Sequence, residues 1–195
     1  MIQNNGLKIY STVNPTLQAA MEQVMLNEPD SKGRTLFPIK ENTYTDPATG
    51  EKVTQTPQAA MVSVDYTGAV VAVVGGLGEK TEDRVLNRAV DSLRQTGSTM
   101  KPIGAYAPAL EYDYIHFSTA LFDDYVKEID DDENPGQKRQ WPQNYSREFS
   151  MTQIPVVTGI AKSLNTIAVR TLMMLGTDAS YDFLTNSVGI STLYD

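Results

Sequence analysis

A serine and a lysine three residues apart, Ser98 and Lys101, are the residues of this sequence whose types and spacing suit covalent chemistry. A serine hydroxyl becomes an effective nucleophile when a neighbouring base takes its proton. Residues three apart on a helix share one face, so the amine of Lys101 can serve as that base. A helix that begins at Ser98 also has free backbone N–H groups for a developing oxyanion. The S-x-x-K pattern therefore predicts acyl transfer, although a capping serine followed by a solvated lysine gives the same pattern.

The neighbouring residues favour a helix that begins at this pair. Gly97 permits a tight backbone turn, and Pro102 suits the first helical turn, where a missing N–H matters least. Tyr106, Leu110 and Tyr114 recur at intervals of four, which predicts that the helix continues through them. The helix would hold the two reactive side chains at a fixed spacing.

A second polar group, Lys162-Ser163-Leu164-Asn165-Thr166, interrupts an otherwise apolar helical pattern between Val157 and Leu175. Serine and asparagine in such a pattern usually mark a break or a cap. The same two residues also suit catalysis, because the hydroxyl of Ser163 can relay a proton and the amide of Asn165 can hold a substrate carbonyl. From these residues alone, both interpretations stay open.

From about Leu7 to Ile190 the chain resembles the penicillin-binding proteins and the serine β-lactamases, whose signatures include S-x-x-K, and five blocks in order carry the resemblance. Their letters are most similar to the class A, bifunctional penicillin-binding proteins. The blocks are T-V-N-P-T-L-Q-A-A from Thr12, G-A-V-V-A-V-V-G-G from Gly68, R-Q-T-G-S-T-M-K-P from Arg94, W-P-Q-N-Y from Trp141 and S-L-N-T-I-A-V-R from Ser163.

The resemblance implies an α/β (α+β) fold in which an antiparallel sheet is flanked by a mainly helical subdomain. It implies a D,D-transpeptidase that cross-links peptidoglycan stem peptides ending in D-Ala-D-Ala and is acylated by β-lactams. Ser98 would be the nucleophile and Lys101 a base; Ser163 would relay a proton, and Asn165 with Gly97 would bind substrate. Whether Lys101 or Ser163 is the immediate base stays open. No cofactor and no metal is implied.

The family's third motif, K-T-G, is absent, since no lysine follows Lys162. The resemblance therefore implies that residues 1–195 are a partial transpeptidase domain. The parent would add a glycosyltransferase domain and a membrane anchor, and would lie at the extracytoplasmic face of the bacterial cell membrane. The fragment is expected to be soluble and weakly active or inactive. It is expected either to self-associate or to need its C-terminal remainder.

Three alternatives remain. A serine β-lactamase or a D,D-carboxypeptidase shares the first motif, but Leu164 stands where a β-lactamase usually has the aspartate of S-D-N. In another class, the chain would be a non-catalytic fragment that only binds or scaffolds. The mass of the chain after incubation with penicillin would separate this alternative from the enzymes.

The composition of the chain excludes several classes of ligand and partner. The 195 residues carry a net charge of −8 with a pI of about 4.7, which argues against nucleic acid. No apolar run is long enough to span a bilayer, and no cysteine is present for disulfides or thiolate metal sites. A single histidine, His116, argues against a Ser-His-Asp triad. The acidic stretch 123–140 lacks the calcium-loop spacing and is predicted to be a solvated, flexible loop.

The remaining pattern predicts the elements around these motifs. The expected elements are a strand with Leu7 and Ile9 and then a helix from Pro15, a surface loop or small insertion at 29–57, a β-hairpin at 58–76 covered on both faces, and mainly helices from Leu86, including a short one within 181–190.

Overall fold

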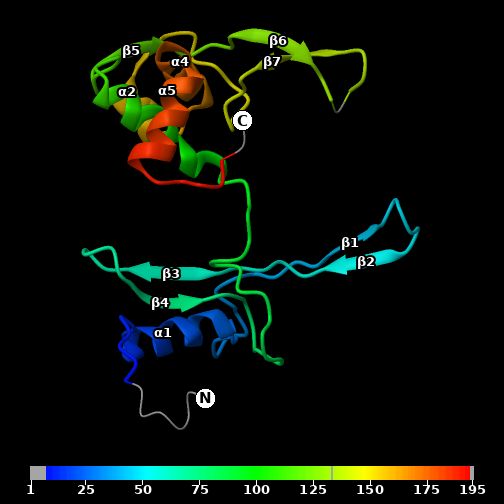
Figure 1. Ribbon diagram of the computed structural model, residues 1–195. Helices are drawn as coiled ribbons and strands as arrows, with labels where there is room; N and C mark the ends of the chain where they lie inside the picture. The colour runs from blue at the N-terminus through cyan, green and yellow to red at the C-terminus, as the bar shows by residue number, and fades with distance from the viewer. Residues whose placement is uncertain (1–7, 133, 194–195) are drawn as a thin grey trace. The chain divides into compact units, whose positions relative to one another are not determined.

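The computed structural model describes residues 8–132 and 134–193, and the chain divides into two compact units, Met1–Leu93 and Arg94–Asp195 (Figure 1). None of the helices in the described residues is long and apolar enough to cross a membrane.

Helix α1 (Pro15–Leu26) opens the described part of the first unit. The side chain of Asn14 accepts hydrogen bonds from the N–H groups of Thr16 and Leu17, each at 3.1 Å, which caps the helix. Pro15 occupies the first helical position, as predicted. The segment before it, from residue 8, is not a strand, and Leu7 of that prediction lies outside the described residues.

The predicted β-hairpin is confirmed as β3 (Met61–Val64) paired antiparallel with β4 (Val70–Val74). Helix α1 lies against β4 (Figure 1), where the Gln18 amide accepts from the N–H of Val73 at 2.9 Å and donates to its carbonyl at 3.0 Å. Helix α1 is the one helix described in this unit. The prediction that this hairpin is covered on both faces is wrong, because three of its valines are exposed: Val62, Val64 and Val70.

The stretch predicted as a surface loop contains a second hairpin, β1 (Asn42–Thr45) with β2 (Lys52–Gln55). The predicted turn is present, because the N–H of Gly50 bonds to the carbonyl of Asp46 at 2.7 Å. This turn brings β1 and β2 into register, and nearly all their residues are exposed.

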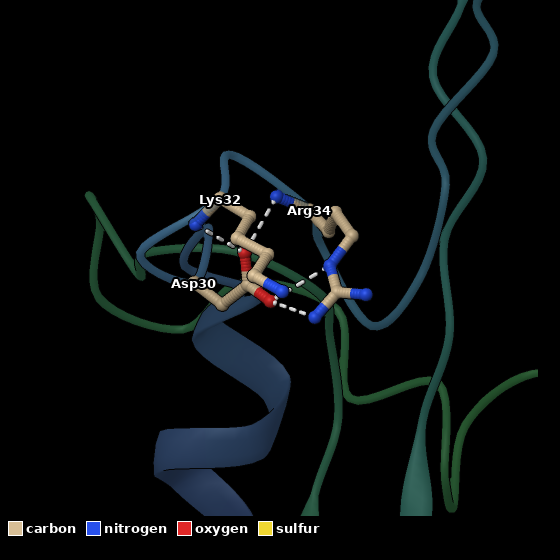
Figure 2. A network of polar contacts seen from close by, with 3 residues as sticks. All are labelled: Asp30, Lys32 and Arg34. Atoms are coloured by element: carbon tan, nitrogen blue, oxygen red, sulfur yellow. Dashed lines mark hydrogen bonds and ion pairs between the residues drawn. The ribbon is translucent and has the colours of Figure 1, made fainter.

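A second turn, after α1, is organised by the carboxylate of Asp30 (Figure 2). It accepts from the backbone N–H groups of Lys32 at 2.8 Å and Arg34 at 2.9 Å, and it pairs with the Arg34 guanidinium at 2.7 Å. These interactions, with the Arg34 side chain first, lower the pKa of Asp30. These contacts fix the turn at residues 30–34.

The second unit combines helices with two antiparallel strand pairs, β5 with β8 and β6 with β7. Its elements are a 3₁₀ turn (Gly97–Thr99), a π-helix (Lys101–Tyr106), α2 (Ala107–Glu111), β5 (Ala120–Phe122), β6 (Lys127–Asp130), β7 (Lys138–Trp141), β8 (Gln153–Pro155), α3 (Val156–Ala161), α4 (Asn165–Leu175), α5 (Thr177–Asp182) and a second π-helix (Phe183–Ser187). The predicted mixed α/β class is confirmed; the described strands form four two-stranded sheets.

Helix α4 supplies much of the core of this unit, with Ile167 fully buried. Tyr106 packs in the same cluster, where burial raises the pKa of its hydroxyl to about 12. The helix predicted through Tyr114 ends earlier, at Glu111, because Asp113 adopts a left-handed φ of 59°. The N–H of Tyr114 then bonds to the carbonyl of Ala109 at 2.9 Å.

The acidic stretch 123–140 is not the solvated loop that the sequence predicts. Strands β6 and β7 pair within it, and an ion pair between the strands joins Asp130 to Lys138. Asp132, on the chain between the two strands, pairs with Arg139. Asp123, at its start, is 4% exposed. Acidic residues early in the stretch thus pair with basic residues later in it, across a hairpin. The first acid, Asp123, is buried in the interior instead.

Candidate functional site

The S-x-x-K segment begins with a sharp turn. Gly97 has a φ of 59°, a conformation that glycine adopts readily. Ser98 follows in the 3₁₀ turn and is exposed, and the π-helix begins at Lys101 with Pro102 at its second position. Short π-helical segments are often found at functional sites. Within the described residues, the Ser98 hydroxyl makes no hydrogen bond, so its oxygen is free to meet a ligand.

The amine of Lys101 joins the two polar groups that the sequence singles out. Its Nζ donates to the backbone carbonyl of Ser163 at 2.7 Å and to the Ser163 hydroxyl at 3.1 Å. Burial lowers the pKa of Lys101, because desolvation disfavours the ammonium form. A lysine held here is therefore easier to deprotonate than a solvated one.

Ser163 lies in the turn between α3 and α4, so the prediction that this turn joins two helices is confirmed. Its φ is 51°, in the left-handed region that few residues other than glycine adopt. Backbone strain of this kind costs about 1–3 kcal/mol and persists where the surroundings require the conformation. The turn thus presents the Ser163 carbonyl and hydroxyl together to Lys101.

Replacing Ser163 with glycine is expected to leave the chain more stable than replacing it with alanine, by about 1 kcal/mol. Both changes remove the hydroxyl, but only glycine relieves the left-handed strain. The free energies of unfolding of Ser163→Gly and Ser163→Ala in urea give the comparison. Equal stabilities would show that the backbone here is not strained.

Asn165 is held by the W-P-Q-N-Y stretch. Its side-chain Nδ2 donates to the carbonyl of Gln143 at 2.6 Å, and its backbone N–H donates to the side chain of Asn144 at 2.9 Å. The N-cap residue of α4 is Leu164, whose side chain cannot accept a hydrogen bond. Asn144, more than twenty residues earlier in the chain, caps the helix instead.

Three buried side chains lie behind this turn: Asp123 and Asn144, each 4% exposed, and Thr166, 0% exposed. Asp123 Oδ1 accepts from the Thr166 hydroxyl at 2.6 Å and from Asn144 Nδ2 at 2.9 Å, and Oδ2 accepts from the N–H of Ser150 at 2.9 Å. Burial raises the pKa of Asp123, but hydrogen bonds led by that from Thr166 outweigh burial, so the pKa is lowered. The carboxylate is therefore ionised at neutral pH.

Sequence reasoning missed Asn144 and Asp123. The W-P-Q-N-Y block is the sequence signal for Asn144. The acidic run 123–140 predicts a solvated loop and so hides the buried position of Asp123. Of the predicted residues, the structure brings Lys101 and Ser163 into contact and places Asn165 at the start of the next helix. Within the described residues, no hydrogen bond joins the Ser98 hydroxyl to the Lys101 amine, and none joins Ser98 or Gly97 to Ser163 or Asn165. No cluster among these residues suits a metal ion.

A cavity of about 560 Å³ lies elsewhere in the second unit, beside α5. None of the predicted site residues lines it. Residues from α4, α5 and the chain that follows surround it, including Leu172, Tyr181 and Leu184. The candidate site is accordingly defined by the polar contacts around Lys101 and Asn165.

Known proteins resemble this chain over most of its length. The family model of the penicillin binding protein transpeptidase domain matches residues 45–192. Penicillin-binding protein 1A of Clostridium acetobutylicum is 29% identical over 191 residues, 93% of this chain and 21% of that protein. Penicillin-binding protein 2a of Streptococcus pneumoniae serotype 2 is 30% identical over 190 residues, 93% of this chain and 22% of that protein.

A third relative, penicillin-binding protein 1A of Haemophilus influenzae, is 36% identical over 141 residues, 70% of this chain and 16% of that protein. This chain spans about a fifth of the length of the first two relatives. The matched region includes the serine and lysine of the first motif, the W-P-Q-N-Y stretch and the turn at Ser163. The chain belongs to the penicillin-binding protein transpeptidase domain family.

Proposed function

We propose that this chain carries the acylation residues of a D,D-transpeptidase that cross-links peptidoglycan stem peptides. The observation that carries the proposal is the contact of Lys101 Nζ with the hydroxyl and carbonyl of Ser163, 2.7–3.1 Å away. It links the serine-lysine pair with the S-x-N turn, although the two lie far apart in the sequence. Family membership supports the same reaction class.

In the acylation step, the Ser98 oxygen attacks the carbonyl carbon between the two terminal D-alanines of a stem peptide. Neutral Lys101 takes the hydroxyl proton, and the C–N bond breaks. The departing D-alanine amine receives a proton through the Ser163 hydroxyl, which the lysine reaches directly. The product is an ester between Ser98 and the shortened stem peptide.

In the second step, the amine of a neighbouring stem peptide attacks the ester carbonyl. A new amide bond forms, the amine loses a proton and the Ser98 hydroxyl is restored. A β-lactam presents a strained amide in place of D-Ala-D-Ala, so ring opening would leave a penicilloyl group on Ser98. Asn165 and Gly97 line the path of the donor peptide in this proposal, and no cofactor takes part.

The proposal places the whole protein at the extracytoplasmic face of the bacterial cell membrane, where peptidoglycan is assembled. The stem peptide and the β-lactam are its ligands there. A β-lactamase would need a further base that activates water to release the acyl group, so the persistence of the acyl group distinguishes the two reactions.

A fluorescent penicillin tests the proposal by covalent labelling. We expect slow labelling of the chain, because the K-T-G motif is absent from it. Ser98→Ala should not be labelled, and Ser146→Ala, at an exposed serine, should be labelled as the unmodified chain is. A peptide ending in D-Ala-D-Ala should slow the labelling, and the label should persist after free penicillin is removed. Rapid loss of the label would favour a β-lactamase, and labelling that survives Ser98→Ala would contradict the proposal.

A further inference from the structure

The turn that carries Ser163 and Asn165 is fixed from behind by residues distant in the sequence. Asn144 Oδ1 accepts the N–H groups of Asn165 at 2.9 Å and Thr166 at 3.3 Å. The Asn144 amide nitrogen in turn donates to Asp123 at 2.9 Å and to the carbonyl of Glu148 at 3.1 Å. The orientation of this amide is therefore set by the carboxylate, because only one of its ends can face an acceptor.

The carboxylate of Asp123 is itself held at both oxygens. Oδ1 accepts from the hydroxyl of Thr166 and from Asn144, and Oδ2 accepts from the N–H of Ser150. Asp123 also joins its backbone to this region, since its N–H bonds to the carbonyl of Thr152 at 2.9 Å. Donors from the β7–β8 connection and from α4 therefore converge on one buried carboxylate, which fixes its position.

We propose that Asp123 and Asn144 are positioning residues that hold the Ser163–Asn165 turn in register with Lys101. Neither touches the reacting atoms; Asp123 orients the Asn144 amide, and Asn144 anchors the first two N–H groups of α4. The effect on turnover rests on the proposed function, whereas the anchoring of the turn does not. A displacement of about 1 Å at such a site is worth about 10²-fold in rate.

Changing Asp123 to asparagine tests this anchoring with little change of volume. The new amide has one acceptor oxygen where the carboxylate has two, so an NH₂ group must face the donors Asn144 and Thr166 or the N–H of Ser150. The matched control is Asp132→Asn, at an exposed acid on the chain that joins β6 to β7. Amide hydrogen exchange in α4 and the rate of penicillin labelling are measured for both.

We expect Asp123→Asn to speed exchange of the Asn165 and Thr166 amides by about 5- to 30-fold, the factor for losing a helix cap. Exchange at Leu172, in the last turns of the same helix, should change much less. Labelling of Ser98 should slow by about tenfold or more, in line with a displaced turn. Asp132→Asn should leave all three quantities unchanged.

A double variant that exchanges the two residues, Asp123→Asn with Asn144→Asp, tests the same contact even if the single variant folds poorly. The amide at position 123 can then donate to a carboxylate at position 144, whose other oxygen still caps α4. We expect this double variant to recover much of the amide protection and labelling rate lost in Asp123→Asn. It leaves the Glu148 carbonyl without its donor, so recovery should be incomplete.

Uniform acceleration of exchange at Asn165, Thr166 and Leu172, with no rescue by the exchanged pair, would overturn the inference and leave Asp123 a general stability residue. Unchanged exchange and labelling in Asp123→Asn would overturn it as well. If the unmodified chain is not labelled, the proposed function fails by itself. The exchange rates at Asn165 and Thr166 still decide whether Asp123 and Asn144 hold the turn.

Discussion

Replacing Lys101 with arginine is expected to slow acylation of Ser98 by β-lactams by about 10²–10⁴-fold, the range for loss of a general base. Arginine keeps the positive charge and the capacity to donate to Ser163, but its guanidinium does not release a proton in the accessible pH range. If Lys101 acted only by holding Ser163 in place, arginine would largely preserve that contact, and the labelling rate would change little. The measurement is the second-order rate of penicillin labelling.

The control is Lys162→Arg, at an exposed lysine beside the Ser163 turn, which should label at the unmodified rate. The pH profile adds an independent check. Because burial lowers the pKa of Lys101, the neutral amine becomes populated below the ordinary lysine value, about 10.4. The labelling rate should rise with pH and level off above this lowered pKa. A rate that Lys101→Arg leaves intact would contradict the role of Lys101 as base.

Replacing Gly159 with alanine is expected to destabilise the second unit by about 1 kcal/mol. A Cβ at Gly159 would lie 2.5 Å from Cγ2 and 2.8 Å from Cβ of Ile167, which is fully buried. These atoms are close to the backbone of α4 and cannot move aside, so α3 and α4 must separate. Overpacking costs about 1–3 kcal/mol and here outweighs the gain in helix propensity of about 1 kcal/mol.

The two helices flank the Ser163 turn, so Gly159→Ala should slow penicillin labelling together with the loss in stability. Urea denaturation gives the free energy of unfolding, and Val157→Ala, at a half-exposed position of the same helix, is the control, expected to change stability little. A Gly159→Ala variant as stable as Val157→Ala would show that α3 and α4 are not in tight contact at this point.

Local sequence patterns predict the parts of the site that depend on neighbouring residues. Gly97 before Ser98 predicts the sharp turn, and the polar residues between two apolar helical stretches predict the break at Ser163. Both features follow from the preferences of a few adjacent residues. The β3–β4 hairpin is predictable for the same reason, since its strands adjoin one turn.

Features that depend on distant contacts are not predictable in this way. The cap of α4 comes from Asn144 because Leu164 has no acceptor, and no spacing rule links residues so far apart. Asp123 looks like the first acid of a solvated run, yet it is buried among donors from the β7–β8 connection and from α4. The helix predicted through Tyr114 ends early because Asp113 adopts a left-handed backbone conformation. The spacing of apolar residues carries no information about that conformation.

Peptide mapping by mass spectrometry after exposure to benzylpenicillin tests the central claim most directly. The penicilloyl group is expected only on the peptide that contains Ser98, and no peptide should carry it after Ser98→Ala. A penicilloyl group on another residue, with Ser98 unmodified, would contradict the assignment of Ser98 as the nucleophile.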